Sequence, residues 1–355
     1  MSNDAWRRIR SLRARRPLLA ADGARRAVFG AALQQSEELF RASAAVGPAS
    51  KPLPLFYALS QAGRAIAAAH NQASSWDYRG HGLGVEVDPT DLRRTVVDVK
   101  PKKGGSDAPS AVAVALDSAP LQGRLQLGQL CGALPELLPA RELAGDALCA
   151  LEVHPEGENP NWLSVLHPAR GRIYARAHTE DEVRSLLQRY CATDGFVLLA
   201  PVGPPAGQIA SVCLEWPGQP RYGATPGTKA VRSLAEIAER VDERFYLVPR
   251  LGTARDAPHR LLVWWALLLA LSSLARYQPA EWIASLDVDE SLLAVDLERT
   301  LSVAEDVLPN MIAQALGSPA GIPTPFINRS IEDRLSNNPG SEEQRSHGDQ
   351  SELGE

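Results

Sequence analysis

Two widely separated segments of the chain are apolar around most of their circumference. The first covers residues 52–71 and the second covers residues 261–277. A surface helix shows a polar stripe, so a helix that is apolar on all sides has to be covered by other elements. Each segment also ends in charged or aromatic polar groups, whose burial is unfavourable without partners. The pattern predicts two core helices that pack on each other, with a polar site at their ends.

Further helical periods flank both apolar segments. Apolar residues recur every three to four positions, with polar residues on the opposite side. A Gly-Pro step ends the second of these periods, and prolines at positions 52 and 54 favour the start of the next helix, where a missing N–H costs nothing. The predicted helices cover residues 5–15, 24–45, 52–71, 234–245 and 259–277, a short helix after Pro279, and residues 289–316.

The middle of the chain has a different pattern. After Gly80, short runs of β-branched residues alternate with Pro, Gly and Asp, which is typical of strands separated by turns. Two helical periods interrupt these runs, and the second opens with Thr179 and Glu182 as a capping box. The predicted strands cover residues 85–87, 95–99, 111–116, 147–153, 172–177, 196–201 and 209–216, and the predicted helices cover residues 125–138 and 179–190.

These elements predict an α+β protein, in which a helical bundle formed by the N- and C-terminal segments carries an inserted mixed α/β sheet region. The segment after Gly317 is rich in Pro, Gly, Ser, Asn and acids and has no apolar period, so we expect disorder there. The predicted parts are N-terminal bundle helices at 1–79, the inserted region at 80–232, C-terminal bundle helices at 233–316 and a disordered acidic tail at 317–355.

The charge of the chain limits how it could bind nucleic acid. The formal net charge of −5 argues against attraction of the whole molecule to nucleic acid. Two local exceptions are the N-terminal 26 residues, which hold eight arginines, and the loop that carries Lys100, Lys102 and Lys103. Nucleic acid is therefore expected as a partner only through these basic segments, whose alternative interpretation is a solvated chain end and a solvated loop tip.

The four cysteines stand far apart among apolar neighbours, which favours small buried thiols over disulfides or metal ligands. The N-terminus lacks the apolar stretch of a signal peptide. The uncharged stretch at 261–275 is shorter than the roughly 20 residues that span a bilayer. We expect a cytoplasmic protein that binds no membrane, metal or cofactor.

Arg64 and His70 lie on the first apolar segment with the Arg-x₅-His spacing found in HEPN-type ribonucleases. In such enzymes a cation stabilises the developing phosphorane charge and an imidazole moves a proton. Arg172 and His178 show the same spacing, so the motif also arises by chance. The alternative interpretation is a structural arginine and a histidine that satisfies a helix end.

Four further residues are candidates for binding. His81 lies between two glycines, which let the backbone approach a neighbour closely, and we expect it to face a pocket with Arg64. Arg276 falls near a helix C-terminus, where a cation meets free carbonyls, with Tyr277 beside it. Glu281 is close enough in sequence to pair with Arg276. A tight turn at His81 and a purely structural joint at Arg276 are the alternative interpretations.

Several of these stretches resemble the YaaC-like family of bacterial proteins. The most specific string is Ser-x-Leu-x-Arg-Tyr-x-Pro-x-x-Trp, which runs from Ser272 to Trp282. The resemblance spans residues 6–316 and implies no catalytic residue, activity or cofactor. The other matching stretches are residues 32–40, 52–66 and 81–83.

Together these observations predict a cytoplasmic YaaC-like binding or interaction protein. Its polar site would be built from Arg64, His81 and Arg276, with His70 as a further member. The alternative is a metal-independent ribonuclease of HEPN type, with Arg64 as charge stabiliser and His70 as acid or base. Such sites are usually built at a dimer interface, so this alternative also predicts a symmetric homodimer.

Overall fold

The computed structural model shows an α+β protein, as the sequence predicts. The chain separates into two compact units, Met1–Ala320 and Gly321–Glu355, and every described residue belongs to the first. The predicted strand at 172–177, the acidic tail after residue 317 and the start of the Thr179 capping box lie outside the described residues. The structure describes residues 3–21, 23–73, 76–78, 80–88, 90–102, 107–155, 162–166, 180–191, 197–202, 211–215, 238–254 and 256–317.

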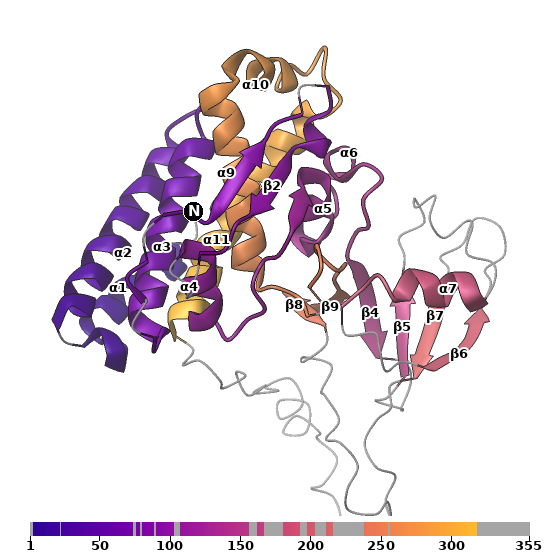
Figure 1. Ribbon diagram of the computed structural model, residues 1–355, viewed down its shortest axis with the longest axis horizontal. Helices are drawn as coiled ribbons and strands as arrows, with labels where there is room; N and C mark the ends of the chain where they lie inside the picture. The colour runs from indigo at the N-terminus through magenta and orange to yellow at the C-terminus, as the bar shows by residue number, and fades with distance from the viewer. Residues whose placement is uncertain are drawn as a thin grey trace, which may run out of the picture. The chain divides into compact units, whose positions relative to one another are not determined.

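The helices at the two ends of this unit pack together, as predicted. Helix α3 contacts α2 on one side and α9 and α11 on others, and α1 packs on α11 (Figure 1). The N-terminal helices are α1 (Asn3–Ala14), the 3₁₀ turn η1 (Leu18–Ala20), α2 (Gly23–Ala44) and α3 (Pro52–His70). The C-terminal helices are α9 (Arg260–Tyr277), α10 (Pro279–Ser285) and α11 (Ala294–Gly317).

The contact between α3 and α9 is unusually close. A Cβ atom at Gly63 would lie 2.2 Å from Cζ3 of Trp265, so the backbone of α3 rests on the indole ring. Helix α9 is buried at every position from Leu261 to Leu274. Among the described residues it is the one helix long and apolar enough to cross a membrane, and 78% of it is buried inside the protein. The two apolar segments therefore form the centre of a single core.

A three-stranded antiparallel sheet covers part of this core, in the order β1-β2-β3. Val97 of β2 pairs with Val85 and with Leu125, and the face that these residues share packs toward α9. The strands are β1 (Leu83–Glu86), β2 (Val96–Val99) and β3 (Arg124–Gln126). The short helices around them are η3 (Leu92–Arg94), α4 (Ala108–Ala115), α5 (Leu127–Gly132), η5 (Pro135–Leu137) and α6 (Arg141–Ala144).

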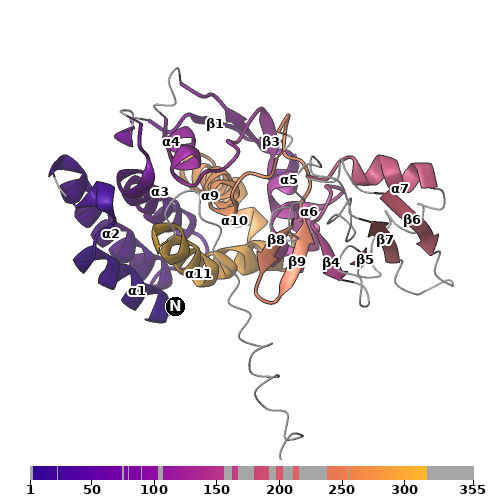
Figure 2. The same cartoon turned by 90° about the horizontal axis from the view of Figure 1, so that it is seen from below.

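A second antiparallel sheet has six strands in the order β6-β7-β5-β4-β9-β8, which Figure 2 shows side by side. Strand β9 pairs with β4, so this sheet joins segments on both sides of the predicted boundary at residue 232; the domain limits themselves stay a prediction. The strands are β4 (Leu151–Pro155), β5 (Trp162–Leu166), β6 (Val197–Val202), β7 (Ser211–Glu215), β8 (Glu239–Val241) and β9 (Arg244–Leu247), and helix α7 (Glu180–Leu187) lies between β5 and β6 in sequence.

Three predicted elements are wrong. Residues 111–115 belong to α4, with Leu116 as its C-cap, because Asp107 caps a helix there, accepting a hydrogen bond from the Ser110 amide at 3.0 Å. The described part of the amphipathic stretch 234–245, from residue 238 onward, contributes instead to the β8–β9 hairpin, which turns at Asp242 with a φ of +54°. The single helix expected at 125–138 is divided into β3, which pairs with β2, and into α5 and η5, which are separate because Pro135 cannot continue a helix.

Candidate functional site

Three of the predicted candidates come together where α3, the last turn of α9 and the segment before β1 meet. They are Arg64, His81 and Arg276, and we call them the cationic cluster. Desolvation holds the pKa of His81 below its ordinary value, and the nearby charges of Arg276 and Arg64 lower that pKa further. The His81 ring also contacts Phe56, with ring centroids 5.8 Å apart. The neutral form of the imidazole is thus favoured, within reach of two guanidinium charges.

Arg276 is fixed to the end of α9. Its Nε donates to the Ser272 carbonyl in the preceding turn of α9 at 3.2 Å, and its Nη1 donates to the Tyr57 hydroxyl at 3.3 Å. Its guanidinium lies 4.9 Å from the centroid of the Tyr277 ring, which is 72% exposed. Arg276 therefore connects α9 to α3 through Tyr57.

Arg64 is held against an aromatic ring. Its guanidinium lies 5.0 Å from the centroid of Tyr78, a residue that is only 2% exposed. Burial raises the pKa of Tyr78, so its hydroxyl stays protonated, and this hydroxyl donates to the Ser60 carbonyl at 3.4 Å. Among the described residues, no carboxylate forms an ion pair with Arg64 or Arg276.

His70 lies elsewhere, at the C-terminal end of α3. Its Nε2 is 3.1 Å from the Leu316 carbonyl near the end of α11, and since a carbonyl can only accept, the ring nitrogen donates. Burial lowers the pKa of His70, and hydrogen bonds to the backbone partly oppose this effect. The geometry therefore joins Arg64 to His81 and Arg276, and it uses His70 to satisfy a helix end.

Glu281 does not pair with Arg276. Pro279 begins a new helix at this corner, and Glu281 on that helix lines a cavity of about 400 Å³ together with Asp88 and Gln278. Tyr277, in contrast, belongs with the cluster through its contact with Arg276.

The basic segments serve partly structural roles. Arg10 donates to the Glu37 carboxylate, and Arg25 donates to the Ala68 carbonyl at 3.0 Å near the end of α3. Lys100 forms an ion pair with Asp98 at 3.0 Å, whereas Lys103 lies outside the described residues. Binding of nucleic acid by these segments stays a prediction.

The sequence did not indicate two residues of the site, both of them tyrosines. Tyr57 and Tyr78 orient the two arginines, yet only the tertiary packing shows which tyrosines contact them.

In the part of the chain that the structure describes, no group of three His, Cys, Asp or Glu side chains is placed to hold a metal ion. Cys131, Cys149 and Cys191 are free thiols.

A family model described as YaaC-like protein matches residues 6–316 of the chain. No curated protein and no solved structure matches it.

Proposed function

We propose that the chain, which belongs to the YaaC-like family, is a binding protein whose cationic cluster holds an anionic group of its ligand. The observation that carries this proposal is the pair of arginines beside His81 that have no carboxylate partner among the described residues. Most guanidinium groups held close together are accompanied by carboxylates, because like charges repel. An anion from outside the chain would supply the missing negative charge.

The chemistry of the cluster favours a phosphate or a carboxylate as the anionic group. Guanidinium groups present planar pairs of N–H donors, which match two oxygens of such anions. The Arg64 side chain stacks on Tyr78, and Arg276 is oriented by Tyr57 and Tyr277, so both cations are ordered before a ligand arrives. Preordering lowers the entropic cost of binding.

The binding proposal is tested with inorganic phosphate, measured by isothermal titration calorimetry at constant ionic strength. Arg64→Ala and Arg276→Ala should each weaken the affinity about tenfold, because each removes a charge-assisted hydrogen bond. Arg299→Ala is the matched control, since Arg299 is exposed on α11 and lies outside the cluster. Equal affinity in all four proteins, with the fold verified by circular dichroism, would contradict the proposal.

The ribonuclease alternative is tested with Arg64→Ala and one further variant, His70→Ala. It requires Arg64 and His70 to act on one phosphodiester, so Arg64→Ala and His70→Ala should both abolish cleavage of total RNA by the purified protein. The binding proposal expects no cleavage by the wild type. Cleavage that depends on both residues would replace the binding proposal by the ribonuclease.

A further inference from the structure

A second arginine-rich site lies away from the cationic cluster, in a cavity of about 580 Å³. Its walls come from the 91–94 segment, the start of α5, the turn at 144–148 and the segments 188–189 and 249–251. Cavities of about 300–1,000 Å³ are typical of sites for small molecules. We propose that this cavity binds a phosphorylated small molecule of nucleotide size, independently of the cationic cluster.

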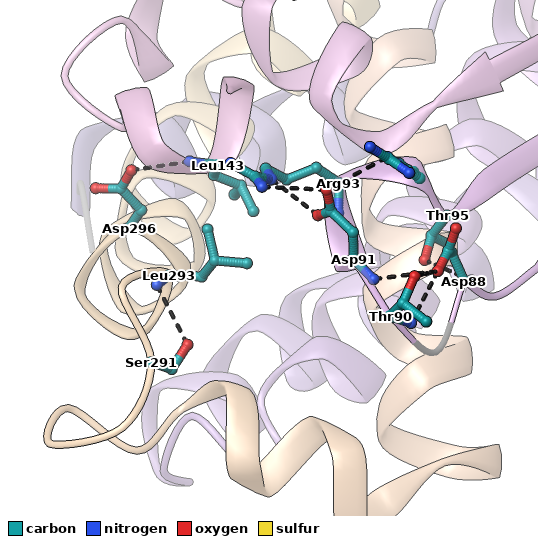
Figure 3. Close-up of polar contacts among 10 residues, drawn as sticks. Asp88, Thr90, Asp91, Arg93, Thr95, Leu143, Ser291, Leu293 and Asp296 are labelled. Atoms are coloured by element: carbon teal, nitrogen blue, oxygen red, sulfur yellow. Dashed lines mark hydrogen bonds and ion pairs between the residues drawn. The ribbon is translucent and has the colours of Figure 1, made fainter. Parts of the chain in front are cut away.

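The charge of the cavity is the first argument. Four arginines line it, and the carboxylates among its lining residues are Asp91 and Asp146. Asp91 already accepts from Arg93 Nε at 2.8 Å and Nη2 at 3.1 Å, and it lies 3.5 Å from Nε of a second arginine. Figure 3 shows the side chains of Arg93 and Asp91 pointing toward one another. The lining arginines are Arg93, Arg94, Arg189 and Arg250.

The walls of the cavity are held in place by hydrogen bonds. Arg250 donates from Nε to the Tyr190 carbonyl at 2.9 Å and from its main-chain N–H to the Arg189 carbonyl at 2.8 Å. The Tyr190 hydroxyl in turn donates to the Cys149 carbonyl at 2.8 Å, beside the 144–148 turn. These bonds connect three of the lining segments, so the cavity is formed before any ligand binds.

The uncharged lining suits the remainder of such a ligand. Gln129 Oε1 accepts from the main-chain N–H of Gln126 at 3.0 Å, which leaves the Gln129 amide nitrogen as a donor group. Leu148, Pro249 and Leu251 supply apolar surface on the same cavity, against which a flat ring can pack. Arginine forks for phosphates and an apolar wall for a ring together fit a nucleotide.

The neighbouring cavity of about 400 Å³ differs from the larger cavity in the charge of its lining. Asp91 and Arg93 line both cavities and so form the wall between them. The other charged residues that line the smaller cavity are all acidic, namely Asp88, Glu142 and Glu281, so a phosphate would be repelled there. Of the two cavities that the Asp91–Arg93 pair separates, the larger one therefore suits a phosphorylated ligand.

The proposal is tested with ATP and the full-length chain, by isothermal titration calorimetry with pyrophosphate and adenosine as further arms. ATP should bind, and adenosine should bind at least tenfold more weakly because it lacks the groups that pair with arginine. Arg94→Ala and Arg189→Ala should each weaken ATP binding about tenfold. Ala147→Phe should do so by filling the cavity without changing its charge, while Arg299→Ala should leave the affinity unchanged.

Two results would overturn the proposal. In the first, the folded wild type binds neither ATP nor pyrophosphate at about 1 mM ligand. A preformed site should bind at least one of them at that concentration. The other is ATP affinity that survives Arg189→Ala and Ala147→Phe but is lost in Arg64→Ala, which would place the ligand at the cationic cluster. Loss of phosphate binding at the cluster alone would leave the cavity proposal intact.

Discussion

His259 is a partly buried histidine that couples folding to pH. Its Nδ1 accepts the Leu261 amide at 3.1 Å at the start of α9, and its own amide donates to the Ser118 hydroxyl at 2.8 Å. Desolvation lowers the pKa of His259 to about 4, with a smaller contribution from the charge of Arg260. Protonation would also remove the acceptor at Nδ1, so the native state requires the neutral ring.

Acidification should therefore destabilise the protein through His259. An unfolded histidine titrates near pH 6.5, so between about pH 6.5 and pH 4 the unfolded chain binds the extra proton and stability falls as pH falls. At pH 5 this group should cost about 2 kcal/mol relative to pH 7.5. Urea unfolding of the wild type and of His259→Asn, which keeps a capping acceptor, measures the difference. Identical pH dependence in both proteins would contradict this assignment.

The grouping of Arg64, His81 and Arg276 could be expected from the sequence. The apolar pattern predicts that the helices carrying Arg64 and Arg276 pack together, and His81 lies in a glycine-rich turn shortly after the first of them. Arg64 and His70, the other pair that the sequence suggests, point in different directions from α3. Six residues along an α-helix correspond to a rotation of about 240° and a rise of about 9 Å. His70 thus lies on another side of α3, where it meets Leu316.

At the scale of the elements, the contact between α3 and α9 forms the centre of the core. Gly63 allows it, since a Cβ there would lie 2.2 Å from Trp265 Cζ3 and 3.1 Å from Val112 Cγ2. The apolar pattern predicted that these helices meet, whereas the position of closest approach depends on the shapes of the facing side chains. Sequence periodicity carries no information about that fit.

Gly63→Ala should destabilise the protein by about 1–3 kcal/mol, because the added methyl group forces the two helices apart. Gly30→Ala is the matched control on α2, where a Cβ would have no heavy atom within 4 Å. That substitution should be neutral or stabilise by up to about 1 kcal/mol, since alanine favours the helix. Chemical unfolding of both variants gives the comparison, and equal stability of the two would show that α3 and α9 are not in close contact.

Elements with local signals were predicted better than elements fixed by distant partners. Helices α1, α2 and α3 have clear local signals, an apolar period or a continuous apolar stretch, and lie close to their predicted bounds. Strand β9 forms because it pairs with β4, almost a hundred residues earlier, and nothing in its local sequence announces that partner. The order of the six-stranded sheet was unpredictable for the same reason.

On the scale of the whole unit, the two ends of the chain close one core. Lys51 forms an ion pair with Glu305 at 2.8 Å, and the Ser43 hydroxyl donates to the same carboxylate at 2.8 Å. The Trp282 indole N–H donates to the Ala49 carbonyl at 2.9 Å. The cationic cluster depends on this closure, because Arg64 belongs to the N-terminal helices and Arg276 to the C-terminal ones.

The most direct test of the cluster is the pKa of His81, measured by nuclear magnetic resonance of its ring protons in chloride and in phosphate at equal ionic strength. In chloride we predict a pKa below the ordinary histidine value, and in Arg276→Ala a higher one, because a repelling charge is removed. Phosphate bound between the arginines should raise the wild-type pKa and have a smaller effect in Arg276→Ala. A His81 pKa that is the same in chloride and phosphate, and unchanged by Arg276→Ala, would contradict the account.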